Sequence, residues 1–426
     1  MDEKIKLALE KQNPWWFNRS FDTGVPRLEF YPELHKYLKT PEVLLILGAR
    51  RTGKSTLAYQ LIKTLSVQPE SILFINLDEP LFQSKSDDPE FLTSLIEEYT
   101  VEQKNVNKFY IFIDEIQNYS YWVQTIKTFH DVNKNLKFVL IGSTSSLLKS
   151  AMSIRLSGRY FSTTIYPLNF KEFFLFNDVK KPTIQQKKQL FGQYLKLGGF
   201  PRVVLEKDKQ LKQDILKNYF QTIYLKDIIY PHKLRNNKDV FDLLYFAISN
   251  IGKPLSYRKI AQLLNISLDT VKEYLLYAEE SYLLFLVRKY DPSVKKQLVN
   301  PQKVYCIDTG LINAVSFKFS ENKGRILENL VFMALQKNYD EIFYHKDKSE
   351  CDFLIKKGAK IITAIQVSLT LKDPDTRKRE LKGILEAIHT HKLKEGIILT
   401  EKEEETIINE NKKIYVKPVY KWLEEF

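Results

Sequence analysis

The sequence predicts an α/β protein with a doubly wound parallel sheet near its start and a separate α/β domain at its end. The first observation is an alternation of helical stretches with apolar runs of strand length, which is typical of parallel strands buried on both faces. These runs are Val43–Leu47, Ser71–Leu77, Phe109–Ile113 and Lys137–Ile141, and Ser55–Leu65 is the clearest helix between them. The second observation is the return of short strands after about Val304.

The rest of the chain divides by the same criteria. Residues 170–225 and 240–290 have helical periodicity, and Gly198-Gly199-Phe200-Pro201 interrupts the first of these segments. In the last part we expect two helices, Gly324–Lys337 and Thr376–His389. The strands expected there are Lys303–Ile307, Cys351–Ile355, Ile361–Gln366 and Gly396–Leu399.

The bulk properties narrow the function classes. With 426 residues, the chain is long enough for two or three domains. The net charge of +13 favours an acidic partner such as nucleic acid, although a lysine-rich proteome would explain it equally well. Cys306 and Cys351 show no metal-ligand spacing, and the N-terminus lacks a signal-peptide core. We therefore expect a cytoplasmic protein without a membrane partner.

A phosphate-binding loop lies between the first strand and the first core helix. Residues 48–55 fit the pattern G-x-x-x-x-G-K-[ST], in which glycines let successive backbone N–H groups face the phosphates. Lys54 is expected to reach the terminal phosphates of ATP, and the Ser55 hydroxyl to bind Mg²⁺. The expected nucleotide-binding residues are Gly48, Arg50, Arg51, Thr52, Gly53, Lys54, Ser55 and Thr56.

The strand Phe109–Ile113 ends in two carboxylates, Asp114 and Glu115. Asp114 lies where a phosphate-bound Mg²⁺ would be, and Glu115 is suited to polarise an attacking water molecule. On its own, a strand that ends in Asp-Glu is weak evidence, because carboxylates often cap the next helix. Downstream of a phosphate-binding loop, the pair predicts an ATPase site that uses Mg²⁺.

For two further candidate residues, the sequence is compatible with a catalytic role and with a structural role. Ser143, in Gly142-Ser143-Thr144-Ser145-Ser146, follows the strand Lys137–Ile141 and could sense the γ-phosphate or cap the next helix. Arg159, in Leu156-Ser157-Gly158-Arg159, could act as an arginine finger on the nucleotide of a neighbouring subunit, or be a solvated or structural arginine.

Together these motifs resemble the prokaryotic AAA-type ATPases that carry an AAA core, a winged-helix segment and a C-terminal nuclease-like domain. The resemblance extends over nearly the full chain. Besides the ATPase motifs, it rests on Gln12-Asn13-Pro14-Trp15-Trp16, Asn76-Leu77-Asp78-Glu79-Pro80, Gly158-Arg159-Tyr160, Pro167–Phe173, Gly198–Pro201 and Pro418–Leu423.

The resemblance implies an ATPase that forms a ring or another homo-oligomer, with a hexamer among the options. It implies an α/β fold with an AAA-type P-loop NTPase core, a helical lid, a winged helix and a C-terminal α/β restriction-endonuclease-like domain. We expect the corresponding segments to be residues 1–165, 166–235, 236–300 and 301–426.

A helix-turn-helix is expected in the winged-helix segment. Ser256 and Ser267 are placed to cap its two helices, and one apolar face is expected from Ile260, Leu263, Leu264, Val271 and Leu275. Residues 281–290 could form the wing. The side chains expected to be exposed for duplex or branched DNA are Arg258, Lys259, Thr270, Lys272 and Tyr274. Winged helices also serve as protein-docking modules, which remains an alternative.

The last segment resembles a PD-(D/E)xK nuclease that has lost part of its site. Glu328 and Asp352 match the helix and strand acids, but Gln366 replaces the second acid and Ser368 the lysine. Loss of these charges weakens a metal site and its transition-state stabilisation. Glu350 could partly compensate for the missing acid, and Lys356, Lys357 or Lys360 for the lysine. The expected role is therefore structural or DNA-docking, with cleavage as the alternative.

Three functions follow from the sequence. The leading one is an AAA-type ATPase coupled to DNA binding or remodelling by an oligomer. The second is a nucleotide-dependent signalling or scaffold switch that acts on protein partners. The third is an ATP-dependent DNA nuclease, which depends on Glu328 and Asp352.

Overall fold

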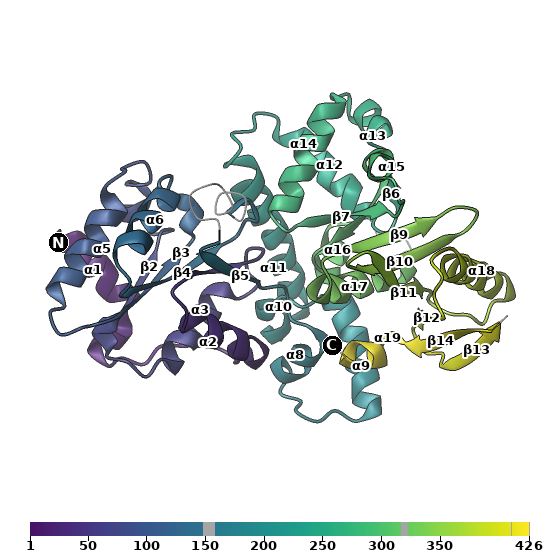
Figure 1. Cartoon of the computed structure of the whole chain (residues 1–426), viewed down its shortest axis with the longest axis horizontal. Coiled ribbons are helices and arrows are strands. Elements are labelled where there is room, and N and C mark those ends of the chain that lie inside the picture. The colour runs from purple at the N-terminus through teal and green to yellow at the C-terminus, as the bar shows by residue number, and fades with distance from the viewer. Residues whose placement is uncertain (148–157, 317–322, 410, 426) are drawn as a thin grey trace. The chain divides into compact units, whose positions relative to one another are not determined.

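A computed structural model describes residues 1–147, 158–316, 323–409 and 411–425, so Leu156 and Ser157 lie outside the described residues. The chain divides into two compact units, Met1–Ile165 and Tyr166–Phe426. Figure 1 shows the elements of each unit. Among the described residues, no helix combines the length and the apolar character that crossing a bilayer requires.

The first unit is built on a five-stranded parallel sheet with the strand order β2-β3-β4-β1-β5. Four strands confirm the expected apolar runs, whereas β5 was not expected, because its consecutive Ser162, Thr163 and Thr164 interrupt any apolar run. The strands are β1 (Val43–Leu47), β2 (Ile72–Asn76), β3 (Phe109–Asp114), β4 (Leu136–Gly142) and β5 (Tyr160–Thr164).

Helices cover both faces of this sheet. In β1, Leu44 and Ile46 point to one face and Leu45 and Leu47 to the other, and all four are buried. One face belongs to a core with α2, α3 and Trp15. The helices are α1 (Glu3–Gln12), α2 (Tyr31–Leu38), α3 (Lys54–Thr64), α4 (Pro80–Gln83), α5 (Phe91–Glu102) and α6 (Trp122–Val132). The carboxyl ends of β1, β3 and β4 therefore carry the predicted ATPase motifs at one edge of the sheet.

The second unit begins with helices, as expected. They are α8 (Phe170–Phe176), α9 (Ile184–Leu197), α10 (Pro201–Leu205), α11 (Lys209–Thr222) with a π-helical extension at Ile223–Ile229, and α12 (Asn237–Ser249). The predicted break between α9 and α10 has a tertiary cause. Gly198 has φ +72°, and a Cβ there would lie 1.9 Å from Oδ1 of Asp308. Oδ2 of the same carboxylate accepts a 2.6 Å hydrogen bond from the Gly199 N–H.

A nine-stranded mixed sheet forms the rest of this unit, in the order β13-β14-β12-β11-β10-β9-β7-β8-β6. Its strands are β6 (Pro254–Leu255), β7 (Leu284–Lys289), β8 (Gln302–Cys306), β9 (Ile342–Lys346), β10 (Glu350–Lys357), β11 (Lys360–Val367), β12 (Glu395–Thr400), β13 (Glu405–Asn409) and β14 (Lys412–Pro418). Strand β7 pairs with both β8 and β9, so the sheet is continuous across residue 300.

The helices of this sheet region are α13 (Tyr257–Leu264), α14 (Leu268–Glu280), α15 (Val294–Val299), α16 (Thr309–Val315), α17 (Lys323–Asn338), α18 (Pro374–Thr390) and α19 (Val419–Trp422). Helix α18 shares a buried core with β10, β11, β12 and β14. The predicted helix caps are confirmed, since Ser256 accepts a hydrogen bond from the Lys259 N–H and Ser267 one from the Thr270 N–H. The four-segment division of the chain stays a prediction.

Candidate nucleotide-binding and catalytic site

The phosphate-binding loop curls between β1 and α3 because its backbone adopts conformations that favour glycine. Gly48 has φ +141°, and a Cβ there would lie 2.1 Å from the carbonyl oxygen of Ile165. Gly53 and Arg51 also have positive φ angles, of 95° and 69°. The loop therefore has the bent path that directs successive N–H groups to one side.

Two polar side chains fold back on this loop. Lys54 is buried, and its Nζ donates a 2.9 Å hydrogen bond to the carbonyl of Ala49. Thr52 Oγ1 donates to the same carbonyl, also at 2.9 Å. The side chains of Thr52 and Lys54, both expected to bind nucleotide, therefore turn toward the loop, whereas Thr56 is exposed on the first turn of α3.

Arg27 is a residue of this region that the sequence-based prediction missed. Its buried guanidinium donates a 3.0 Å hydrogen bond from Nη1 to the carbonyl of Thr52. Its own backbone N–H donates to Oε1 of Gln60 on α3, at 3.1 Å. Arg27 therefore stabilises the loop from a segment that has no recognisable sequence pattern. The only sequence signal for Arg27 was a charged residue next to apolar ones.

Asp114 and Ser55, the two predicted Mg²⁺ ligands, are brought together from β3 and α3. Asp114 is buried at the end of its strand, and burial followed by the nearby Glu115 carboxylate raises its pKa to about 6. A hydrogen bond from the Ser55 side chain and the charge of Lys54 act in the opposite direction and lower this pKa. A carboxylate and a hydroxyl oxygen fit Mg²⁺, which prefers oxygen ligands.

Glu115 is held by three neighbours. It has φ +53°, and its Oε1 forms an ion pair with Nη1 of Arg50 at 3.2 Å. Gln117 Nε2 donates hydrogen bonds to Oε2 of Glu115 and, at 3.0 Å, to Oγ of Ser143. Ser143 Oγ also lies 3.4 Å from Glu115 Oε2. The ends of β3 and β4 and the phosphate-binding loop thus meet at one carboxylate, and Gln117 is a second residue that the predicted site omitted.

Arg159 lies elsewhere in the first unit. It precedes β5, and its carbonyl accepts a 2.9 Å hydrogen bond from the N–H of Val43, the first residue of β1. Its guanidinium pairs with Asp131 on α6 at 3.0 Å. The phosphate-binding loop follows the other end of β1, about 16 Å away for a strand of five residues. A role for Arg159 at its own nucleotide is therefore excluded, while a role at a neighbour's stays a prediction.

The helix-turn-helix residues are confirmed in part. Arg258, Lys259 and Lys272 are exposed, as expected. The expectation for Tyr274 is wrong, because its ring is buried on the inner side of α14, at 7 % exposure. Leu263 was expected in the apolar face but is 65 % exposed. Tyr274 belongs to the buried stripe of α14, with Val271, Leu275 and Ala278. In α13 only Ile260 is buried, so the apolar face of this helix is narrower than expected.

The nuclease-like residues meet in the second unit. Asp352 on β10 and Gln366 on β11 are adjacent, since the Asp352 N–H donates to Oε1 of Gln366 at 3.2 Å. Glu328 on α17 and Asp352 both contact the Nζ of Lys303, at 3.1 and 2.9 Å. Lys303 is the lysine in contact with this cluster, whereas Lys357 and Lys360, which could have compensated for the missing lysine, pair with each other in the register of β10 and β11. Lys356 instead pairs with Glu341.

Comparison with known families divides the chain into three parts. A family model described as an AAA domain matches residues 40–174. Two models of domains of unknown function, DUF8612 and DUF4143, match residues 188–322 and 323–422. The AAA domain model covers the sheet, the phosphate-binding loop and the Asp114–Glu115 pair.

Relatives of similar length share nearly the whole chain. An uncharacterized protein of Methanocaldococcus jannaschii is 34 % identical over 404 residues, which cover 89 % of this chain and 88 % of the relative. An uncharacterized protein of Haemophilus influenzae is 30 % identical and covers 82 % of this chain and 88 % of its own length. The solved structure of C. elegans PCH-2 is 16 % identical, with a TM-score of 0.26 over 66 % of this chain and 69 % of that one, which is too low to support any inference.

Proposed function

The chain belongs to the family of these M. jannaschii and H. influenzae proteins and carries an AAA domain, and on this basis we propose that it binds ATP with Mg²⁺ and hydrolyses it. The observation that carries the proposal is the meeting of Ser55, Asp114 and Glu115 beside the phosphate-binding loop.

Each residue has a role that follows from its chemistry. The loop N–H groups and Lys54 would bind the phosphates, and Ser55 and Asp114 would hold Mg²⁺, which would supply neutralisation of phosphate charge. Glu115 orients a water molecule and accepts its proton as the water oxygen bonds to the γ-phosphorus and the bond to ADP breaks. Arg50, Gln117 and Ser143 fix the direction of the Glu115 carboxylate.

The test separates binding from chemistry. Glu115→Gln keeps the size of the side chain but removes the base, so we expect ATP to bind while phosphate release slows by about 100-fold or more. Glu97→Gln changes an exposed glutamate of α5 in the same way and serves as the control. Phosphate release that is unchanged in Glu115→Gln would remove Glu115 from the mechanism.

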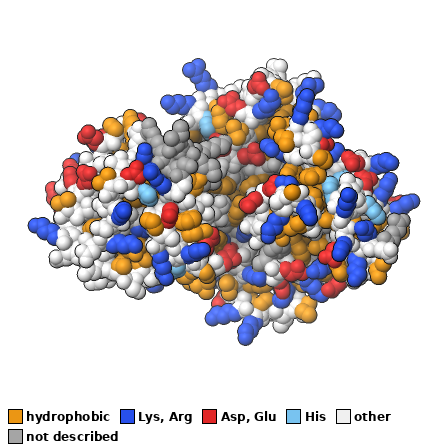
Figure 2. Space-filling view, viewed as in Figure 1, with side chains coloured by type: hydrophobic (Ala, Val, Ile, Leu, Met, Phe, Trp, Pro, Cys, Tyr) orange, Lys and Arg blue, Asp and Glu red, His pale blue; other side chains and the backbone are white. Residues whose placement is uncertain are grey.

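Coupling to DNA and assembly into an oligomer are the finer parts of the proposal. The charge of +13 is spread out, since Figure 2 shows on one face of the molecule Lys and Arg side chains intermixed with Asp and Glu. The DNA proposal therefore rests on local features rather than on the total charge. The order α12, β6, α13, α14, β7, β8 supports a winged helix that exposes Arg258, Lys259 and Lys272.

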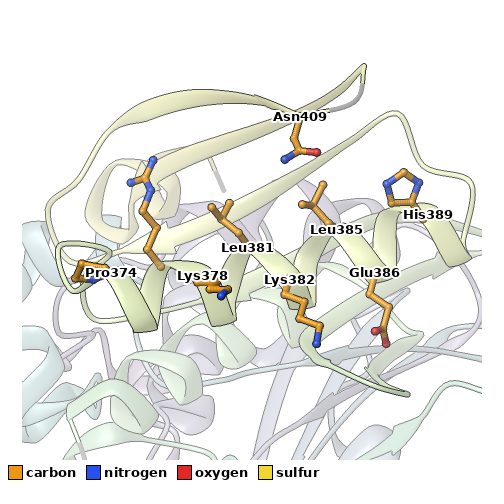
Figure 3. Close-up of a pocket in the computed structure, with 9 residues that line it drawn as sticks. Pro374, Lys378, Leu381, Lys382, Leu385, Glu386, His389 and Asn409 are labelled. Atoms are coloured by element: carbon orange, nitrogen blue, oxygen red, sulfur yellow. The ribbon is translucent and has the colours of Figure 1, made fainter.

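A second basic surface lies on α18. A groove of about 640 Å³ is lined by Lys378, Lys382, His389 and Asn409, among others. Figure 3 shows Leu381 and Leu385 pointing toward Asn409 of β13, and Lys382 and Glu386 pointing away from it. Arg377, which also lines the groove, pairs with Glu405, so part of the local charge is neutralised. Lys272 of the helix-turn-helix is likewise paired, with Asp269 at 2.9 Å. The exposed Arg258 and Lys259 are therefore the better candidates for DNA contact. A switch that acts on protein partners remains the competing function.

A further inference from the structure

A buried lysine stands at the centre of the nuclease-like cluster. Lys303 lies on β8, and its side chain is 1 % exposed. Its ammonium contacts three carboxylates, Glu328 at 3.1 Å, Glu350 at 2.8 Å and Asp352 at 2.9 Å. An ammonium group has three N–H donors, so these contacts use all of them.

The resemblance to PD-(D/E)xK nucleases implies a divalent metal ion between the helix acid and the strand acid. In this chain Glu328 and Asp352 turn oxygens toward one point, but that point is taken by the Lys303 nitrogen. The other oxygen of Asp352 accepts a 2.9 Å hydrogen bond from the Val367 N–H. The oxygen of Glu328 that faces Lys303 also accepts a 2.6 Å hydrogen bond from Tyr305. These carboxylates therefore have little coordination capacity left for a metal.

The surroundings also exclude a phosphodiester. Glu328 Oε2 faces the backbone of Gly252, where even a Cβ would lie only 2.8 Å from it. On the opposite side, Gln366 Nε2 donates to Glu380 of α18 at 2.6 Å. Glu328, Asp352, Gln366 and Glu380 are all buried. A nucleic-acid backbone needs direct access to the metal ligands, which this packing does not give.

The charges agree with a fixed cation at this point. Burial alone would lower the pKa of Lys303, but Asp352 and Glu328 outweigh burial and hold this pKa well above its ordinary value. Lys303 in turn lowers the pKa of Glu350 against the effect of burial. Lys303 therefore stays charged and stabilises carboxylates that would otherwise repel one another.

We infer that the Lys303 ammonium is the permanent cation of this cluster and replaces the divalent metal ion that the nuclease resemblance implies. The residues do not fit a metal while Lys303 is present. The domain therefore uses the cluster to hold α17, β8 and β10 together rather than to cleave DNA.

The test removes the ammonium from the full chain, without nucleotide, and uses Mn²⁺ as the probe. Lys303→Met keeps an unbranched stem but leaves the carboxylates without a cation. We expect this variant to bind one Mn²⁺ more than the wild type does. The additional Mn²⁺ should bind at least ten times more tightly than any Mn²⁺ bound at the wild-type cluster. The variant should also have a higher melting temperature with Mn²⁺ than without it. Adding Asp352→Asn should abolish both effects. Electron paramagnetic resonance of free Mn²⁺ measures the binding.

Two outcomes would overturn the inference. One is Mn²⁺ binding by the wild type that Asp352→Asn removes, since a metal would then share the cluster with Lys303. The other is a folded Lys303→Met variant that neither binds Mn²⁺ nor is stabilised by it. If Lys303→Met does not fold with or without Mn²⁺, the triple variant Lys303→Met, Glu328→Gln, Asp352→Asn decides. Its folding without Mn²⁺ would support the charge argument. Its failure to fold would overturn the inference, because a neutral cluster with the same unbranched stem would then still be unstable.

Discussion

The Arg50 guanidinium and the Glu115 carboxylate form an ion pair, with Nη1 and Oε1 3.2 Å apart, between the phosphate-binding loop and the end of β3. Both side chains are largely buried, at 11 % and 13 % exposure. The cation that pairs with the proposed base thus belongs to the loop that receives the phosphates. We expect phosphate oxygens to compete for the same guanidinium, so that nucleotide binding would be coupled to the release of Glu115 at this contact.

Lys54→Ala should weaken ATP binding by about 10- to 100-fold, because the variant cannot make the charge-assisted hydrogen bonds of the ammonium to the phosphates. Calorimetric titration with a non-hydrolysable analogue measures the effect. Lys63→Ala, in the last turn of the same helix, is exposed and should bind like the wild type. Equal affinity of both variants would argue against the loop as the phosphate site.

Asp114 should make Mg²⁺ binding depend on pH. With its pKa raised to about 6 by burial and by Glu115, a proton competes with Mg²⁺ below about pH 6. The Mg²⁺-dependent part of ATP affinity should fall as the pH drops through this value. Titration at pH 5, 6 and 7.5 checks this, and Asp114→Asn should remove the dependence.

The raised pKa of Asp114 also predicts that the stability of the nucleotide-free protein falls as the pH rises, whereas its Mg²⁺ affinity rises with pH. A carboxyl whose pKa is raised in the folded protein contributes to stability at pH values below its pKa in the unfolded chain, which is near 3.8. That contribution is lost as the pH rises through about 6. Asp114→Asn should therefore raise the free energy of unfolding of the nucleotide-free protein at pH 7, by at most about 3 kcal/mol. Asp269→Asn, at a 90 % exposed position in an ion pair with Lys272, should change it by less than about 1 kcal/mol. A destabilised Asp114→Asn protein would contradict the argument.

Arg159→Ala should lower ATP hydrolysis while ATP still binds, if Arg159 acts on a neighbouring subunit. Mixing this variant with Glu115→Gln subunits should restore part of the activity, because a mixed interface can pair an intact finger with an intact base. Asp131→Ala separates the ion pair from this role. An exposed pair contributes little to stability, so Asp131→Ala should keep its activity. Full activity of Arg159→Ala, or of a strictly monomeric enzyme, would reject the role.

Binding to duplex or branched DNA should weaken steeply with salt, because each neutralised phosphate releases counterions. Changing Arg258, Lys259 and Lys272 together to Glu should weaken binding for all sequences and reduce the salt slope by about 0.9 for each phosphate that is no longer neutralised. Fluorescence anisotropy at several salt concentrations measures both. Cleavage should stay negligible with Mg²⁺ or Mn²⁺.

The matched control reverses the charge of three lysines outside the helix-turn-helix. Lys207, Lys209 and Lys217 are exposed near and on α11, and their change to Glu alters the net charge equally. If both triple variants bind DNA equally weakly, the helix-turn-helix has no special role. Salt-insensitive binding, or none near physiological ionic strength, would favour the switch that acts on protein partners.

Local patterns explain most of what the sequence predicted correctly. The strands β1 to β4 and the helix α3 follow from apolar runs and from the glycines of one loop, and each signal lies within a dozen residues. The proximity of Ser55 and Asp114 could also be predicted from the sequence, because the carboxyl ends of parallel strands meet at the same edge of a sheet.

The sequence did not reveal the roles of two buried lysines, because their partners are distant along the chain. Lys137 on β4 donates to the carbonyls of Tyr37, Thr40 and Glu42. Lys303 meets Glu328 and Asp352, which follow it by 25 and 49 residues. Both lysines stand in apolar strands where an exposed charge was the simplest interpretation. A sequence gives no distance between such groups until the sheet order is known.

The carboxylate of Asp308 has a consequence for the order in which the chain can fold during synthesis. It completes the turn at Gly198 and Gly199 from a position 109 residues further along. The first unit is continuous in sequence and can fold as soon as it leaves the ribosome. Helices α9 and α10 cannot fix their mutual angle until β8 and the start of α16 have emerged, so this part of the second unit reaches its final packing only after Asp308 has left the ribosome.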